Sequence, residues 1–248
     1  MEAFVTRTVI WFSCGAASAV AGRLMLDKAQ GGTVIAYCDT GSEHPDNERF
    51  LADCERWYGQ RILKLKSQNY TDTWDVFEKT RYLAGVRGAR CTVELKKRVR
   101  FGFEQPGDIQ VFGFTAEETH RANRCREQNH DVILSTPLID QGLKKADCFD
   151  RLRAAGIELP AMYKLGYRNN NCIGCVKGQA GYWNKIRRDF PEVFAKMSRV
   201  EREIGAAICK TEVGGVRKRI FLDELDPEAG KYEEQNISCG LLCDQEGA

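Results

Sequence analysis

The stretch that most constrains the fold of this chain is residues 8–20, which read TVIWFSCGAASAV. The first part is an uncharged run of β-branched and aromatic residues, which predicts a buried strand. The strand ends in a tight turn of small residues, and a small-residue helix follows. This arrangement brings backbone N–H groups and the positive end of a helix dipole to one point, where a phosphate group can bind. An ordinary turn that only packs tightly has the same pattern, so both interpretations stay open.

The following segments alternate strand and helix patterns. We expect helices over 16–28, 47–58 and 71–80 and further strands over 33–38, 61–65 and 110–114. Strands joined by crossover helices of this length predict a doubly wound, mostly parallel α/β sheet. In such sheets ligands bind at the carboxyl ends of strands, so we expect Ser13-Cys14-Gly15 and Asp39-Thr40-Gly41 to share one crevice. The second motif also fits an ordinary turn in which Gly41 takes a positive φ.

Length and composition limit the architecture and the class of protein. The 248 residues can form one large α/β domain or one domain with a smaller appendage. From the strand and helix pattern and the candidate phosphate-binding turn we expect a nucleotide-binding α/β domain over 1–165, followed by a small, helical, cysteine-containing subdomain over 166–248. The hydrophobic content of 43% is typical of a globular protein, and no apolar run approaches the roughly 20 residues of a membrane span. Because the start, Met1-Glu2-Ala3-Phe4, lacks the features of a signal peptide, we expect a cytoplasmic protein without membrane contact.

Charge is distributed unevenly along the chain. The net charge is only +2, but basic residues cluster at 96–100, 121–126 and 217–219. Such clusters are usually solvated surfaces, and near a phosphate-binding turn they can also hold an anionic substrate.

The eleven cysteines favour metal or redox chemistry. An odd number of thiols in a reducing compartment argues against a disulfide framework. The C-x-x-C of Cys172 and Cys175 can chelate one centre with two thiolates. Four further cysteines lie in apolar segments and are expected to be core residues: Cys38, Cys54, Cys148 and Cys209.

Several motifs in one order resemble those of the phosphoadenosine phosphosulfate reductase family. That family belongs to the adenine-nucleotide α-hydrolase-like superfamily, as do the PP-loop ATP pyrophosphatases, and the motifs are also similar to phage-borne members. The motifs are SCGAAS at 13–18, DTGSEHPDNERF at 39–50, RCTVELK at 90–96, GFTAEETHR at 113–121, the C-x-x-C at 172–175 and SCGL at 238–241. The chain departs from the family where Thr92 replaces the second cysteine of a Cys-Cys pair, and where Ser238 and Leu242 replace Glu and His of the tail.

The resemblance implies an adenine nucleotide as the substrate: adenylyl sulfate, its 3′-phosphorylated form or ATP. Arg121 offers the planar donor fork that suits phosphate or sulfate. Lys96, about one helical turn beyond Cys91, is a catalytic candidate that would bring a cation near the nucleotide and the metal centre. The implied nucleotide-binding residues are Ser13, Cys14, Gly15, Ala16, Ser18, Asp39, Thr40, Gly41, Glu118, Thr119 and Arg121.

The resemblance also implies a [4Fe–4S] cluster, because the family members that carry one use the Cys-Cys pair and a later C-x-x-C. Cys91, Cys172 and Cys175 match three ligands of this set. The fourth ligand must come from Cys239 or Cys243, and we assign Cys243 to the metal and Cys239 to catalysis. A zinc site made by the two C-terminal cysteine pairs is the competing arrangement, but it leaves Cys91 unexplained.

In reductases of this family, the tail cysteine attacks the sulfur of the bound sulfonucleotide, and an external thiol then releases sulfite. Cys239 matches that cysteine, so we expect a sulfonucleotide reductase with a thioredoxin-like protein as reductant. The alternative is an ATP-using sulfurtransferase that thiolates nucleic acid, in DNA phosphorothioation or tRNA thiolation, although Ala17 stands where PP-loop enzymes have Asp. A nucleotide-binding module without turnover is a third interpretation, and a homo-oligomer is left open.

Overall fold

The computed structural model describes residues 6–28, 32–85, 88–213 and 215–232, together with Ile237 and Cys239. The chain divides into two compact units. The first contains Met1–Asp39, His44–Lys66 and Arg98–Asn170, and the second contains Thr40–Glu43, Ser67–Lys97 and Asn171–Ala248. The predicted 166–248 subdomain therefore covers only one of the three segments of the second unit, and its boundary at 165 stays a prediction.

A five-stranded parallel sheet forms the centre of the first unit, in the order β3-β2-β1-β6-β7. Its strands are β1 (Thr8–Phe12), β2 (Thr33–Cys38), β3 (Ile62–Leu65), β6 (Ile109–Val111) and β7 (Ile133–Ser135). Thr8 of the central strand β1 lies opposite both Thr33 and Ile109. The order reverses at β1, which confirms the predicted doubly wound α/β class.

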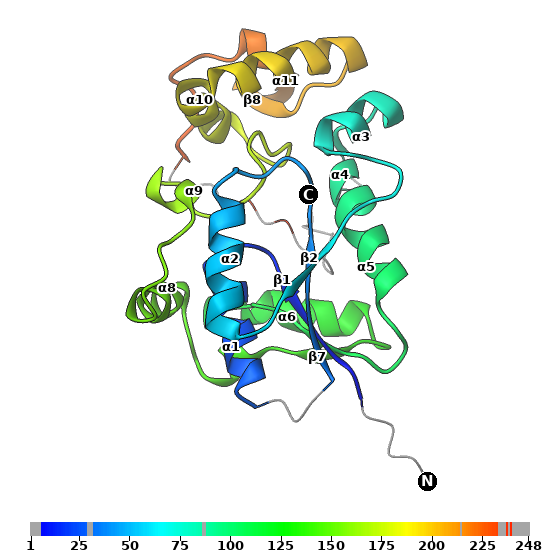
Figure 1. Cartoon of the computed structure of the whole chain (residues 1–248). Coiled ribbons are helices and arrows are strands. Elements are labelled where there is room, and N and C mark those ends of the chain that lie inside the picture. The colour runs from blue at the N-terminus through cyan, green and yellow to red at the C-terminus, as the bar shows by residue number, and fades with distance from the viewer. Residues whose placement is uncertain are drawn as a thin grey trace. The chain divides into compact units, whose positions relative to one another are not determined.

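Helices cover the two faces of this sheet. Helix α1 (Ala16–Leu26) joins β1 to β2, and α2 (Asn47–Tyr58) joins β2 to β3. Because both right-handed crossovers run in the same direction, both helices lie on one face, where Figure 1 shows them side by side. Helix α6 (Thr119–Gln128) joins β6 to β7 in the opposite direction and therefore covers the other face. The other helices of the unit are α5 (Arg98–Phe103), η2 (Ala116–Glu118), α7 (Pro137–Asp140), α8 (Lys145–Ala154) and α9 (Ala161–Lys164).

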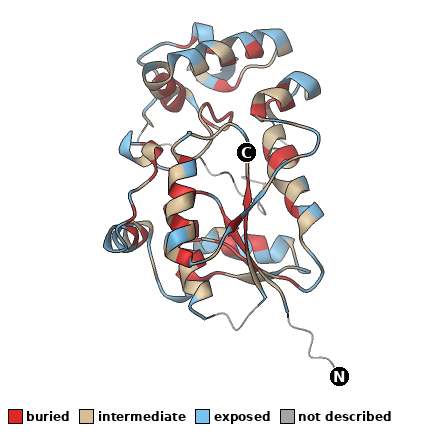
Figure 2. Ribbon diagram, in the orientation of Figure 1, coloured by how far each residue is buried: buried red, intermediate tan, exposed pale blue. Residues whose placement is uncertain are grey.

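The uncharged strands fill the core of the first unit, and Figure 2 shows β1 and β2 as largely buried. On the α1 face, Phe12 packs against Phe50 and Tyr58, and the Tyr58 hydroxyl donates to the Ala19 carbonyl at 2.8 Å. On the opposite face, the Trp11 indole donates to Gln110 at 2.5 Å. The four cysteines expected in the core are all buried, which confirms that prediction.

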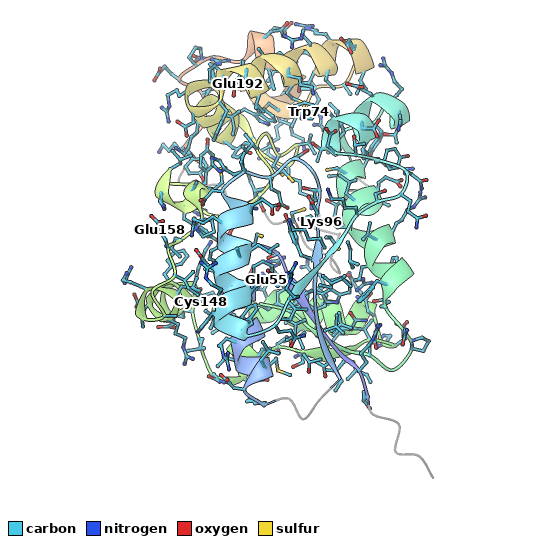
Figure 3. The ribbon with its side chains drawn as sticks, viewed as in Figure 1. Glu55, Trp74, Lys96, Cys148, Glu158 and Glu192 are labelled. Atoms are coloured by element: carbon cyan, nitrogen blue, oxygen red, sulfur yellow. The ribbon has the colours of Figure 1, made fainter. Side chains whose placement is uncertain are left out.

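The second unit is mainly helical. Its elements are α3 (Thr73–Thr80), β4 (Ala84–Gly85), β5 (Gly88–Ala89), α4 (Arg90–Thr92), η1 (Val93–Lys97), α10 (Ala180–Asp189), α11 (Pro191–Ile204), β8 (Cys209–Val213), β9 (Val216–Ile220) and η3 (Leu222–Glu224). The ammonium group of Lys196 lies 4.4 Å from the centre of the ring of Trp74, which Figure 3 labels on α3, and this contact links α11 to α3. Across the described stretches of both units, no helix combines the length and apolar character that a membrane span requires.

A buried carboxylate ties together three elements of the second unit. Glu201 on α11 is fully buried, and its two oxygens accept hydrogen bonds from the backbone N–H groups of Ile208 (2.5 Å) and Leu222 (2.6 Å). Burial raises the pKa of Glu201 to about 6, although the two N–H donors favour the ionised form. The chain around β8 and η3 therefore depends on a carboxylate that is costly to ionise.

We expect Glu201 to make the protein less stable as pH rises from about 4.5 to 6. Because the pKa is raised in the folded state, the folded chain binds this proton more tightly than the unfolded chain does. The resulting contribution to the free energy of unfolding is fully present below pH 4.5 and is lost as pH rises through 6. The loss is about 2 kcal/mol for a shift of this size. Urea unfolding of Glu201→Gln should lack this part of the pH dependence, whereas the exposed control Glu203→Gln should keep it. Equal pH slopes in the two variants would contradict the assignment.

Candidate functional site

The turn after β1 is held by its own side chains. The Ser18 hydroxyl accepts hydrogen bonds from the Ser13 N–H and the Ser13 hydroxyl, both at 3.0 Å, and donates to the Gly15 carbonyl at 3.0 Å. Cys14 has a φ of +53°, which is uncommon for a residue other than glycine, and its side chain is fully buried. Helix α1 begins directly after this turn, at Ala16. The turn is therefore preorganised at the amino end of a helix, as the sequence predicted for residues 13–18.

The segment after β6 packs directly on this turn. A Cβ atom at Gly113 would lie 2.7 Å from the Ser18 backbone nitrogen and Cα, so only glycine allows this approach. The beginning of the predicted 113–121 nucleotide segment is thereby held against the predicted phosphate-binding turn within the first unit.

Two residues that the sequence motifs did not identify support the turn. A Cβ atom at Gly15 would lie 3.3 Å from the Tyr163 hydroxyl oxygen, and burial raises the pKa of Tyr163 to about 12. The Asn170 side-chain amide donates to the Cys14 carbonyl and to Asn47 Oδ1, each at 2.7 Å. Neither partner is close in sequence, so a local pattern could not have indicated these roles.

The predicted residues of the 113–121 segment bond largely to one another. Glu118 accepts a hydrogen bond from the Thr115 N–H at 3.2 Å and forms an ion pair with Arg121. The Arg121 guanidinium carbon lies 5.3 Å from the centre of the Phe114 ring. Thr119 donates to the Ala116 carbonyl at 2.8 Å, so it stabilises the start of α6. A phosphate or sulfate would have to replace Glu118 as the partner of Arg121.

Lys145 is a further cation of the first unit that the sequence did not indicate. It begins α8, and its ammonium group donates to Asn169 Oδ1 at 2.7 Å. Burial lowers the pKa of Lys145, while the carboxylates of Glu118 and Glu117 oppose this effect. Lys145 is therefore electrostatically coupled to the same acidic residue that pairs with Arg121.

The chain passes from the first unit to the second within the predicted Asp39-Thr40-Gly41 motif. Asp39 forms an ion pair with Lys66 at 3.2 Å. Thr40 is buried; its hydroxyl lies 3.1 Å from Cys172 Sγ and 3.4 Å from Glu43 Oε1. Gly41 has a φ of +66°, and a Cβ atom there would lie 2.3 Å from the Thr71 carbonyl oxygen. Within its own unit, Thr40 is thus bonded to a cysteine, and its predicted contact with a nucleotide stays a prediction.

Four cysteines line one cavity of the second unit. They are Cys91, Cys172, Cys175 and Cys239, and the same cavity is lined by Thr40, Thr92, Lys96 and Lys177. Burial raises the pKa of the first three thiols, that of Cys175 to about 11. Their proximity to Cys239 raises each pKa further, whereas Lys96 opposes the shift in all three. Thiols from three distant segments therefore lie close enough to affect one another's pKa, and Lys96 acts on all three, with Lys177 acting on Cys91 and Cys175 as well.

The C-x-x-C turn is organised by Tyr182, which the sequence motifs did not identify. Its hydroxyl accepts hydrogen bonds from the N–H groups of Gly174 (3.1 Å) and Cys175 (2.9 Å) and donates to the Cys172 carbonyl (3.3 Å). Gly174 has a φ of +77°, and Tyr182 is almost fully buried. One phenol therefore fixes the backbone between the two cysteines.

The predicted catalytic Lys96 is held by a carboxylate. Lys96, labelled in Figure 3, lies on the π-helical segment η1, a rare conformation that is frequent at functional sites. Its ammonium group is 3.8 Å from Glu43 Oε1, and only 12% of the Lys96 side chain and 6% of the Glu43 side chain are exposed. Glu43 lies in the DTGSE motif but was not singled out as a site residue.

The four cysteines of the cavity are the candidate ligands of a metal centre. No group of three or more Cys, His, Asp or Glu side chains in the part of the chain that the structure describes is arranged as a metal-ion site. Cys243 and Ser238 lie outside the described residues. The donor chemistry itself, four thiols with two lysines in one cavity, fits an iron–sulfur cluster or zinc.

Comparison with known proteins identifies a distant relative but no family. No protein-family model matches the sequence. An uncharacterized protein of Methanocaldococcus jannaschii is 27% identical over 208 residues, which make up 79% of this chain and 41% of that protein. The chain thus spans about two fifths of the length of this relative. The resemblance to the reductase family stays a prediction.

We expect Gly113→Ala to disturb the turn after β1. The new methyl group would overlap the Ser18 backbone, which costs about 1–3 kcal/mol and displaces the amino end of α1. Thermal unfolding should show the loss of stability, and calorimetric titration should show weaker binding of ATP and of adenylyl sulfate. Gly102→Ala is the matched control, because a Cβ atom there meets nothing within 4 Å. Unchanged binding in Gly113→Ala would mean that the turn does not hold the nucleotide.

Proposed function

We propose that this chain is an adenine-nucleotide-dependent enzyme of sulfur metabolism and, within that class, a sulfonucleotide reductase. The observation that carries the proposal is the cavity of the second unit, where four thiols from three distant segments meet two lysines. The preorganised turn after β1 gives independent support, because it suits the anionic end of a nucleotide.

In the first unit, the proposed role of the turn is to bind a phosphate or sulfate group. The Ser18 bonds hold the turn at the amino end of α1, so little conformational freedom would be lost when an anion binds. Arg121 would exchange its ion pair with Glu118 for two parallel bonds to the anion. Lys145, already coupled to Glu118, would help to balance the displaced carboxylate.

In the second unit, the proposed cofactor is a [4Fe–4S] cluster, with zinc as the alternative. Cys91, Cys172 and Cys175 would hold it together with one cysteine of the tail. When bound, a cluster supplies a polarisable metal centre whose properties depend on hydrogen bonds to its sulfur ligands. Lys96 and Lys177 would offset the negative charge that four thiolates bring into one cavity.

The proposed reaction uses a thiolate of the tail, from Cys239 or Cys243. This thiolate attacks the sulfur of adenylyl sulfate; an S–S bond forms, the S–O bond to the phosphate breaks, and the nucleoside phosphate leaves. A thiolate of an external dithiol protein then attacks the cysteine sulfur. Sulfite leaves with the electron pair of the S–S bond, and the second external thiol closes a disulfide that frees the cysteine.

A second candidate is ATP-dependent thiolation of nucleic acid, and one observation favours it. The β8–β9 hairpin exposes Lys210, Arg217, Lys218 and Arg219, and Lys210 lies directly opposite Arg219. Like charges in directly opposed positions destabilise a hairpin, and a bound phosphate backbone would offset this repulsion.

We expect protein purified without oxygen to release sulfite from adenylyl sulfate or its 3′-phosphorylated form when a dithiol is supplied. Arg121→Ala should raise KM by about tenfold or more, because it removes a charge-assisted pair of bonds worth about 1.5–3 kcal/mol. Arg153→Ala, at an exposed position on α8 outside the basic clusters, is the control. If the protein instead releases pyrophosphate from ATP, faster in the presence of nucleic acid, and releases no sulfite, the reductase proposal is wrong and the second candidate is supported. If neither sulfite nor pyrophosphate is released, the remaining interpretation is a nucleotide-binding module without turnover.

If the second candidate is correct, the hairpin should bind DNA or RNA with a strong salt dependence. The double variant Arg217→Gln, Lys218→Gln should weaken binding and reduce the slope of log K against log salt by about 2, one for each lost phosphate contact. The double variant Arg151→Gln, Arg153→Gln removes the same charge from exposed positions on α8 and should bind normally. An unchanged slope would exclude the hairpin as the nucleic-acid contact.

A further inference from the structure

The position of Cys239 bears on which thiols form the ligand set. Cys239 lines the same cavity as Cys91, Cys172 and Cys175. A C-x-x-C and a lone cysteine supply three thiolates, and a cubane cluster or a tetrahedral zinc site needs a fourth.

A specific bond anchors the segment that carries Cys239. The side-chain amide of Asn171, next to Cys172, donates to the Ile237 carbonyl at 3.0 Å. Ile237 is itself buried, two residues before Cys239. This hydrogen bond therefore holds the segment of Cys239 next to the C-x-x-C segment.

Thr92 explains how the chain accommodates the replacement in the Cys-Cys pair. Its side chain is 1% exposed, and its hydroxyl oxygen lies 3.5 Å from Cys239 Sγ. A metal-bound thiolate can only accept a hydrogen bond, so the hydroxyl would be the donor. Thr92 thus provides no ligand but holds the sulfur of a cysteine from another segment.

Thr40 has the same relation to a second sulfur. Its hydroxyl lies 3.1 Å from Cys172 Sγ and 3.4 Å from Glu43 Oε1, so the sulfur is the nearer of the two acceptors for its single proton, and Thr40 is almost fully buried. Two of the four sulfur atoms therefore each have a threonine hydroxyl within hydrogen-bond distance. Such bonds delocalise the charge of a thiolate and make it easier to keep in a low-dielectric cavity.

We propose that Cys91, Cys172, Cys175 and Cys239 are the four ligands of one thiolate-bound metal centre, and that Thr92 and Thr40 donate hydrogen bonds to two of these ligands. The proposal rests on the proposed function, because it takes from it the presence of a metal. It differs from the expected assignment of Cys243 as the fourth ligand and of Cys239 as the attacking thiol, and that assignment stays a prediction.

The test is the metal and acid-labile sulfide content of protein purified without oxygen. Wild type and Cys243→Ser should each hold about four irons per chain, and Cys239→Ser should lose half or more of that iron. Full iron in Cys239→Ser with loss in Cys243→Ser would overturn the ligand set. Far-UV circular dichroism of each variant shows whether the fold is retained.

The metal content of wild type separates this inference from the proposed function. A wild type that holds neither iron nor zinc would overturn both the metal centre and its ligand set. One zinc per chain that only Cys239→Ser loses would support the ligand set and overturn the iron–sulfur cofactor. Iron in wild type with no effect of Cys239→Ser would overturn the ligand set alone.

Thr92 provides a test that does not depend on the folding of a cysteine variant. Thr92→Val keeps the shape of the side chain and removes its donor, so a chelator should extract the metal faster than from wild type. Thr92→Ser retains the hydroxyl and should restore the slower rate. Where the metal is an iron–sulfur cluster, Thr92→Val should also shift the reduction potential to a more negative value. Equal extraction rates in Thr92→Val and wild type would overturn the role of Thr92.

Discussion

The tight turn between β1 and α1 is the constraint on which the first unit depends. A left-handed conformation at Cys14 costs about 1–2 kcal/mol for a residue with a side chain. The bonds of Ser18 and the burial of the Cys14 side chain offset this cost. The close approach of Gly113 then holds the segment after β6 against the same turn. Strain that several contacts maintain together is typical of binding sites, which is why this turn is the best candidate for the nucleotide.

The second unit depends in a similar way on the hydroxyl of Tyr182. This group occupies the N–H donors of Gly174 and Cys175, which in many cysteine-ligated centres point at sulfur. The negative charge of thiolates in the cavity would then be balanced by side chains. Thr40, Thr92 and Lys96 lie in positions to do this. The unit therefore combines a backbone fixed by a phenol with sulfur atoms surrounded by donors from other segments.

Local patterns predicted the fold well where each element depends on its own sequence. The predicted bounds 33–38 and 47–58 match β2 and α2, because the apolar runs and the glycine at 59 are local signals. The π-helical segment η1 and the contacts of Tyr163 and Asn170 could not be predicted, since they depend on distant residues. The same limit applies to the site: motif order indicated the thiols at 91, 172 and 175, but not that the Thr40 hydroxyl would meet Cys172.

The location of Cys239 also changes how a reductase could work on this scaffold. A thiolate bound to a metal shares its charge with that metal and is a weaker nucleophile than a free thiolate. If Cys239 is a ligand, the attack on a sulfonucleotide requires a different thiol. The tail of this chain has a second one, Cys243, where the family pattern has a single cysteine. The extra cysteine of the tail would then compensate for the cysteine that Thr92 replaces in the Cys-Cys pair. In the proposed ligand set, one tail thiol would take over the missing ligand position, and the other would be left for catalysis.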